Sequence, residues 1–229
     1  MKTFDRPSIL AGFSGLLFVG LSLVIVAMVP PLPSLNKSVA EIATYYTTHG
    51  RLFLLGNYLA TFAAVPSFIF FSFLVWQIKK NEGEGWLWIT VLMTTVIAHS
   101  VGAVDLIFFQ MAAHLGANGL GGGQSAAAEI LKMVSDLACL GFGFFFIMQG
   151  ALAIYVSWAI FKTRALAPLH AWLGLLTGVF SFLASLGTVQ TTGPLTIGGP
   201  VTTIGFLIFF VWIAGMSVAM IRSENFKSR

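Results

Sequence analysis

Charged residues are scarce in this chain: Asp, Glu, Lys and Arg make up 9% of its 229 residues. Soluble domains average about 25%, so a water-soluble protein of this size could not cover its surface with so few charges. Hydrophobic residues account for 57% of the sequence. The apolar excess must face a lipid bilayer, and we therefore expect an integral membrane protein.

Cysteine is scarce as well, and the common catalytic motifs are absent. The single cysteine, Cys139, excludes an intrachain disulfide and any site built from several cysteines. No Gly-rich phosphate loop, His-Glu-x-x-His or Gly-x-Ser-x-Gly motif occurs. The net charge of +4 comes from basic residues near the ends of apolar runs, where they set orientation in a membrane. We therefore predict no nucleic-acid partner and no cofactor, and favour a noncatalytic role over an enzyme.

Long apolar runs are what the sequence has in abundance. A spanning helix needs about 20 mostly apolar residues, whereas the strands of a membrane barrel show short alternating segments. The runs here are continuous, which predicts an all-α polytopic membrane protein with six transmembrane helices in a single domain, residues 1–229. The expected spans are residues 8–28, 52–76, 86–112, 134–161, 169–189 and 201–221.

Basic residues divide unevenly between the two sides of such a bundle. By the positive-inside rule the richer side is cytoplasmic, which predicts that both termini lie in the cytoplasm. The richer side holds Lys2, Arg6, Lys79, Lys80, Lys162, Arg164, Arg222, Lys227 and Arg229, and the other holds Lys37, Arg51 and Lys132.

Two segments outside the expected spans also carry helix signals. Residues 38–41 read Ser-Val-Ala-Glu, a capping box, and Gly50 is a typical helix stop. We expect a short amphipathic helix between them, lying at the outer interface; an ordinary polar loop is the alternative. Residues 126–161 contain no breaker except scattered glycines, so we expect one helix that projects beyond the bilayer.

Small residues repeat at helical spacings in several spans. Such stripes let helix backbones approach closely in lipid, so they predict contacts within the bundle, with a membrane-protein partner, or with a second copy of the chain. The stripes are Gly56, Ala60 and Ala64; Gly143 and Gly150; and Gly174 and Gly178.

Polar residues at membrane depth are the candidate ligand or proton sites, because an ionisable side chain inside the bilayer is costly. The candidates are Asn57, His99, Asp105, Asp136 and Gln149. His99 has three interpretations: a haem ligand, a proton or ligand site, or a hydrogen bond between helices. The third of these is favoured, because the other histidines lie near the interfaces.

A second candidate set lies toward the outer side. Asp105, His114 and Asp136 would form a metal site if they converged, and two facing carboxylates could share a proton. The alternative is that Asp136 pairs with Lys132 and that a hydroxyl group or a water satisfies Asp105. His99 and Asp105 are about 240° apart around one helix, so we expect them to contact two different neighbours.

Three functions remain open on these residues. A transporter or channel would use a cavity lined by Asn57, His99 and Gln149. A membrane enzyme or cofactor-binding subunit would use Asp105, His114 and Asp136. An accessory subunit would bind another membrane protein through the small-residue stripes. A noncatalytic bundle with a ligand, partner or permeation role is the leading interpretation.

One junction resembles known families. Residues 157–168 read SWAIFKTRALAP and are followed by Trp172-Leu173-Gly174, while residues 40–46 read AEIATYY. The chain thereby resembles bacterial multi-spanning membrane families of unknown function. The resemblance implies six helices and a bacterial inner membrane, and it implies no activity.

Overall fold

The computed structural model describes residues 6–118, 126–190 and 192–222. Those residues are 86% helical and contain no strand. The helices are α1 (Arg6–Met28), α2 (Val39–Glu82), α3 (Leu87–Ala117), α4 (Ala126–Thr163), α5 (Pro168–Ser185), the 3-10 helix η1 (Leu186–Thr188) and α6 (Pro200–Arg222). The α-helices among them number six, and all are long and apolar enough to span a membrane, which confirms the predicted fold class.

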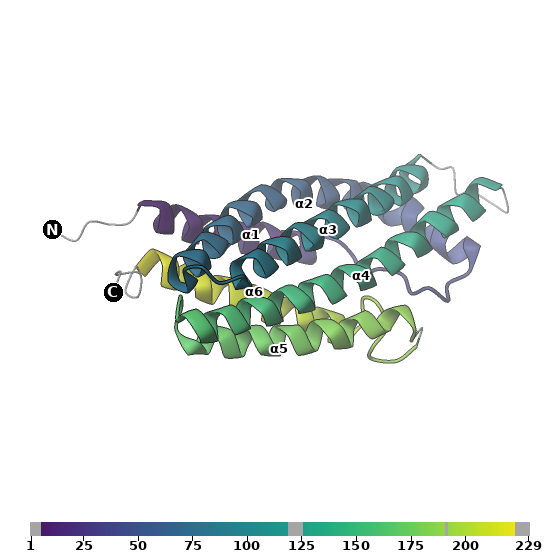
Figure 1. Ribbon diagram of the computed structural model, residues 1–229. Helices are drawn as coiled ribbons and strands as arrows, with labels where there is room; N and C mark the ends of the chain where they lie inside the picture. The colour runs from purple at the N-terminus through teal and green to yellow at the C-terminus, as the bar shows by residue number, and fades with distance from the viewer. Residues whose placement is uncertain (1–5, 119–125, 191, 223–229) are drawn as a thin grey trace.

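The six helices close into a ring (Figure 1). Each packs on its neighbours in sequence, α1 also packs on α6, and α4 contacts α2 across the ring. The start of α1 and the end of α6 lie at the same end of the bundle, which we call the termini end. The opposite end is called the far end.

Three consecutive helices are longer than the rest. The helices α2, α3 and α4 have 44, 31 and 38 residues, against 23, 18 and 23 for α1, α5 and α6. At 1.5 Å per residue the short helices span about 27–35 Å, close to the hydrocarbon thickness of about 30 Å. The long helices span about 46–66 Å, and they project past the others at the far end (Figure 1).

The expected interfacial helix is the first part of α2. Its capping box forms as predicted: the Ser38 hydroxyl oxygen accepts from the Glu41 amide at 3.3 Å, and Glu41 accepts from the Ser38 amide at 2.9 Å. The helix does not stop at Gly50, however, and runs on into the second span. A Cβ at Gly50 would lie 2.8 Å from the Ala113 carbonyl oxygen. The glycine thus serves close packing on α3, which corrects the expected helix end.

Other helix ends shift less. The helix α3 extends five residues past the predicted position 112, and the predicted fifth span ends in η1. The helix that begins at Ala126 is continuous to Thr163, as expected for a projecting segment. Pro66 lies inside α2, and α2 follows a curved course in Figure 1.

The small-residue stripes are used for contacts within the chain. Gly56 packs against Val29, the residue that follows α1. A Cβ at Gly150 of α4 would lie 3.2 Å from the Gly178 carbonyl oxygen of α5, and a Cβ at Gly174 would lie 2.9 Å from the Trp212 ring of α6. These contacts match the close backbone approach that such spacings predict.

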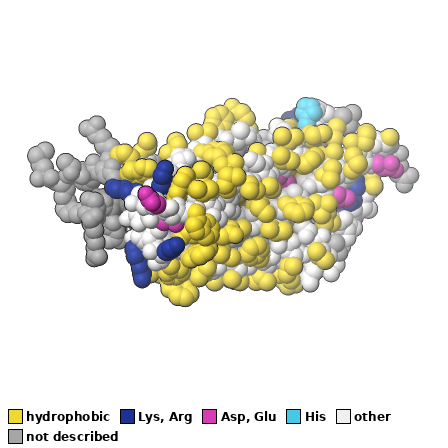
Figure 2. Space-filling model, in the orientation of Figure 1, with side chains coloured by type: hydrophobic (Ala, Val, Ile, Leu, Met, Phe, Trp, Pro, Cys, Tyr) yellow, Lys and Arg dark blue, Asp and Glu magenta, His cyan; other side chains and the backbone are white. Residues whose placement is uncertain are grey.

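Two hydrophobic cores fill the bundle. The larger one, the ring core, takes buried side chains from all six helices, among them Phe70, Val91, Val156 and Trp212. The smaller one, the projection core, takes its buried side chains from α2, α3 and α4, with Tyr46 fully buried, and Val29 and Leu32 pack against it. Outside these cores, Figure 2 shows a broad apolar surface between charged ends, as expected for a surface that contacts lipid.

Candidate functional site

His99 lies between α2 and α3 with both ring nitrogens engaged. Nδ1 is 2.8 Å from the Thr95 carbonyl oxygen, which can only accept, so Nδ1 carries the proton. Nε2 therefore accepts from the Ser67 hydroxyl group at 2.9 Å. The ring stacks on Phe68 with centroids 4.1 Å apart. These contacts are those of a hydrogen bond between helices, the interpretation that the sequence favoured.

Gln149 and Asn57 occupy other parts of the bundle. Gln149 is buried on α4, and its Nε2 donates to the Ser181 hydroxyl oxygen of α5 at 3.3 Å. Asn57 lies on α2, and its Nδ2 is buried without a hydrogen-bond partner. The contacts of His99 and Gln149 thus belong to two different helix pairs, and the structure brings neither of them to Asn57.

Asp136 pairs with Lys132 one turn away on α4, which is the alternative left open by the sequence. The Lys132 ammonium group also donates to the Leu35 carbonyl oxygen at 3.3 Å. Leu35 belongs to the connection between α1 and α2, which we call the strap (residues 29–38). Through this hydrogen bond, Lys132 fastens the strap to α4.

Side chains of α4 and α2 also donate hydrogen bonds to proline carbonyl groups of the strap. The Cys139 thiol of α4 donates to the Pro33 carbonyl oxygen at 3.5 Å. The Tyr45 hydroxyl group of α2 donates to the Pro31 carbonyl oxygen at 2.6 Å. Prolines cannot donate from their nitrogens, but their carbonyl groups still accept. The proline-rich strap is thus held by side chains of the two projecting helices that flank it.

Asp105 is buried on α3 and faces α4. Its side chain is 4% exposed, and Oδ1 has no hydrogen-bond partner. A Cβ at Gly141 would lie 2.5 Å from that oxygen, so the carboxyl group lies flat against the α4 backbone. His99 faces α2 and Asp105 faces α4, which confirms that the two residues contact different neighbours.

The residues considered for a metal site remain apart. Asp105 is buried, Asp136 is bound to Lys132, and His114 is exposed on α3. Within the described ranges, no three His, Cys, Asp or Glu side chains lie close enough together to hold a metal ion.

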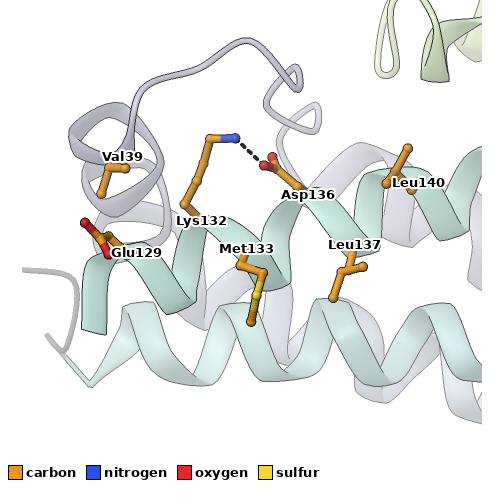
Figure 3. Close-up of a pocket in the computed structure, with 7 residues that line it drawn as sticks. All are labelled: Val39, Glu129, Lys132, Met133, Asp136, Leu137 and Leu140. Atoms are coloured by element: carbon orange, nitrogen blue, oxygen red, sulfur yellow. Dashed lines mark hydrogen bonds and ion pairs between the residues drawn. The ribbon is translucent and has the colours of Figure 1, made fainter. Parts of the chain in front are cut away.

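Two open grooves lie at the far end. The α4 groove has a volume of about 420 Å³, and Lys132 and Asp136 lie on one side of it with Val39 opposite (Figure 3). Met133 and Leu137 complete its apolar lining. The strap groove is larger, about 740 Å³. Its polar lining includes Lys37, Glu41, Tyr45, His49 and Thr196.

Sequence reasoning missed the role of Gly141 and the contacts of the strap. Gly141 stands outside the predicted small-residue stripes, and nothing in the sequence aligns it with Asp105 of another helix. Cys139 is buried, and its thiol also donates to the strap, a contact that nothing in the sequence indicates. The run of prolines before Ser34 was the available signal, since it marks a segment outside any helix.

Comparison with known proteins gives no relative. No protein-family model, curated protein or solved structure matches the chain. The function is therefore argued from the side chains and their arrangement.

Proposed function

We propose that the chain is a noncatalytic membrane protein that binds a partner or ligand at its far end, and that this end faces away from the cytoplasm. The observation that carries the proposal is the projection of α2, α3 and α4 beyond the membrane-length helices, with two open grooves on it. A bundle that only filled the bilayer would not need this extension.

The charge distribution supports the orientation. Lys79 and Lys80 end α2, Lys162 lies in the last turn of α4, and Arg222 ends α6, all at the termini end. Basic residues next to spans favour the cytoplasmic side. The far end would then face the periplasm or the exterior.

The polar residues inside the bundle support a noncatalytic role. His99 and Gln149 hydrogen-bond across helix pairs, as polar residues that stabilise helix packing do. The two grooves combine apolar walls with a few charged groups, a mixture typical of binding sites. A small amphipathic molecule or a protein segment fits this chemistry.

Site-specific photocrosslinking tests the binding role. A photoreactive amino acid would replace Thr48 of the strap groove or Glu129 of the α4 groove, and Lys80 at the termini end would serve as the control; Thr48, Glu129 and Lys80 are all exposed. We expect one defined adduct, of the same mass, from Thr48 and Glu129 in native membranes. Its absence from both, or equal adducts from Lys80, would contradict the proposal.

Thiol labelling tests the orientation separately. A Thr48→Cys variant in a Cys139→Ser background should react with a membrane-impermeant maleimide in intact cells. A matched Lys80→Cys variant should react only after the membrane is permeabilised. The reverse pattern would place the far end in the cytoplasm.

A further inference from the structure

The Asp105 carboxyl group differs from the other polar groups described inside the bundle. Its side chain is 4% exposed, its Oδ1 has no hydrogen-bond partner, and the ion pairs found among the described residues, Lys37–Glu41 and Lys132–Asp136, do not include it. Moving an unpaired carboxylate from water into an apolar interior costs far more than moving the neutral acid. A buried carboxyl group without a counter-charge is therefore a candidate for binding a proton or a cation.

The depth of Asp105 places it near one face of the bilayer. It lies 18 residues after Leu87, the first residue of α3 at the termini end. That separation corresponds to about 27 Å along the helix axis, and the hydrocarbon core is about 30 Å thick. The carboxyl group thus lies just inside the far-end border of the lipid core, with the projection core above it.

Few titratable groups face Asp105 from the helices packed around it. Tyr46 of α2 and Cys139 of α4 are within electrostatic reach of it, and the Lys132–Asp136 pair lies further out on α4. The Ser135 hydroxyl group donates to the Tyr46 hydroxyl oxygen at 3.4 Å, which closes the α2–α4 contact above the carboxyl group. Neutral hydroxyl and thiol groups supply no charge to offset a carboxylate.

The strap closes the same region from the far end. Cys139, two residues from Gly141 along α4, donates to the Pro33 carbonyl oxygen. Two turns further out, Lys132 donates to the Leu35 carbonyl oxygen. The strap is therefore fastened to α4 directly beyond the place where Asp105 packs on α4.

We propose that Asp105 is a proton-binding site that the strap closes and that loads from the far end. A bound proton removes the net charge of the carboxyl group and adds an O–H donor in a packed environment. Release of the strap from Lys132 and Cys139 admits water, which accepts the proton. Asp105 itself lines neither groove, and this proposal does not depend on the proposed binding function.

The composition of the site favours a proton over a small metal cation. Cations such as Ca²⁺ take about 6–8 oxygen ligands and Mg²⁺ about six, whereas no second carboxylate joins Asp105, since Asp136 is occupied by Lys132. A monovalent cation such as Na⁺ shares the requirement for oxygen ligands. The experiment must therefore distinguish a bound proton from bound Na⁺.

Labelling with dicyclohexylcarbodiimide tests the proposal on the full chain in liposomes. This apolar reagent reacts with a protonated carboxyl group: the acid proton moves to a carbodiimide nitrogen, and the carboxyl oxygen adds to the central carbon. We expect an adduct on Asp105 by peptide mass mapping, with a rate that falls with rising pH, by about tenfold per pH unit above the midpoint. Asp105→Asn removes the adduct, whereas the matched Asp136→Asn variant keeps it.

The outcomes separate the ligands. Equal labelling in sodium chloride and in choline chloride supports the proton, and protection by sodium alone overturns it in favour of a cation site. No adduct on the unmodified chain at any pH also overturns the proposal. The pH profile of the unmodified chain decides the question even if Asp105→Asn fails to fold.

A water-soluble carbodiimide tests the route past the strap. Lys132→Ala removes one attachment of the strap to α4, and we expect Asp105 to be labelled up to about fivefold faster. Lys37→Ala is the matched control, because Lys37 is itself a strap residue whose ion pair with Glu41 joins the strap to α2 and not to α4. Equal rates in the unmodified chain and in Lys132→Ala would overturn entry from the far end.

Discussion

The ring core and the projection core are built on different principles. The ring core draws side chains from all six helices, and the polar pairs beside it, Ser67–His99 and Gln149–Ser181, bond from helix to helix. The projection core draws on three helices, and the strap above it is held by polar contacts from Lys132, Cys139 and Tyr45. Helices inside lipid satisfy their own backbone groups and are held together mainly by packing, whereas the non-helical strap offers carbonyl groups to which side chains of the projection donate. The comparison teaches that the projection is the part able to open locally.

The largest expected effect lies in the ring core. Trp212 is fully buried, and its indole nitrogen donates to the His170 carbonyl oxygen at 2.8 Å. Trp212→Ala leaves a cavity and removes this hydrogen bond between α6 and α5, so we expect a loss of about 3–5 kcal/mol in unfolding free energy. Unfolding in mixed micelles measures it, with Trp86→Ala, at an exposed tryptophan, as the control. Equal losses would mean that the ring is not a single cooperative core.

The second largest effect is expected in the projection core, where Gly116 packs closely on Tyr46. A Cβ at Gly116 would lie 2.8 Å from the backbone carbon of Tyr46, whereas a Cβ at Gly20 meets no atom within 4 Å. We expect Gly116→Ala to cost about 1–3 kcal/mol, and Gly20→Ala to cost nothing. Hydrogen exchange should rise in residues 42–53 and stay unchanged in residues 209–220. A matching rise in residues 209–220 would show that the two cores open together.

A smaller effect is expected at the start of α2. Ser38→Ala removes the side-chain acceptor of the capping box, which costs about 1 kcal/mol. The amides of residues 39–42 should exchange faster, and the ring core should not respond. Ser34→Ala is the control, since its hydroxyl group bonds only Asn36 in the strap. Unchanged exchange would mean that tertiary packing alone holds this turn.

The smallest effect concerns the hydrogen bond between α2 and α3. Ser67→Ala removes the donor to His99, and such bonds in membranes contribute about 0.6 kcal/mol on average. Thr61→Ala is the matched control, because the Thr61 hydroxyl group donates within its own helix to Asn57. Paired unfolding measurements should show a small loss for Ser67→Ala alone. A loss of unfolding free energy as large as that of Trp212→Ala would show that the Ser67–His99 hydrogen bond does more than stabilise helix packing.

The sequence predicted the architecture well, because the bilayer imposes it. Runs such as residues 8–28 and 201–221 could only be helices in lipid, and they match α1 and α6 within two residues at each end. Gly50 was misjudged because glycine serves both as a helix stop and as a close-packing residue. Local sequence does not show that Ala113 of α3 lies against it.

The sequence identified the individual polar residues, but it did not predict which of them contact one another across helices. The Lys132–Asp136 pair follows from a spacing of four on one helix and was identified in advance as an alternative. The contact of Asp105 with Gly141 joins two helices whose relative rotation the sequence does not specify. The strap escaped prediction because its attachments are backbone carbonyl groups, which every residue carries.

The continuity of α2 has a mechanical consequence. This one helix is about 66 Å long. It contributes Tyr46 to the projection core and Phe70 to the ring core. Tilting such a lever by about 5° displaces one tip by about 6 Å relative to the other. A load on the groove-bearing tip would therefore also act on the tip that carries Lys79 and Lys80, with Pro66 between them as the place where the helix can bend.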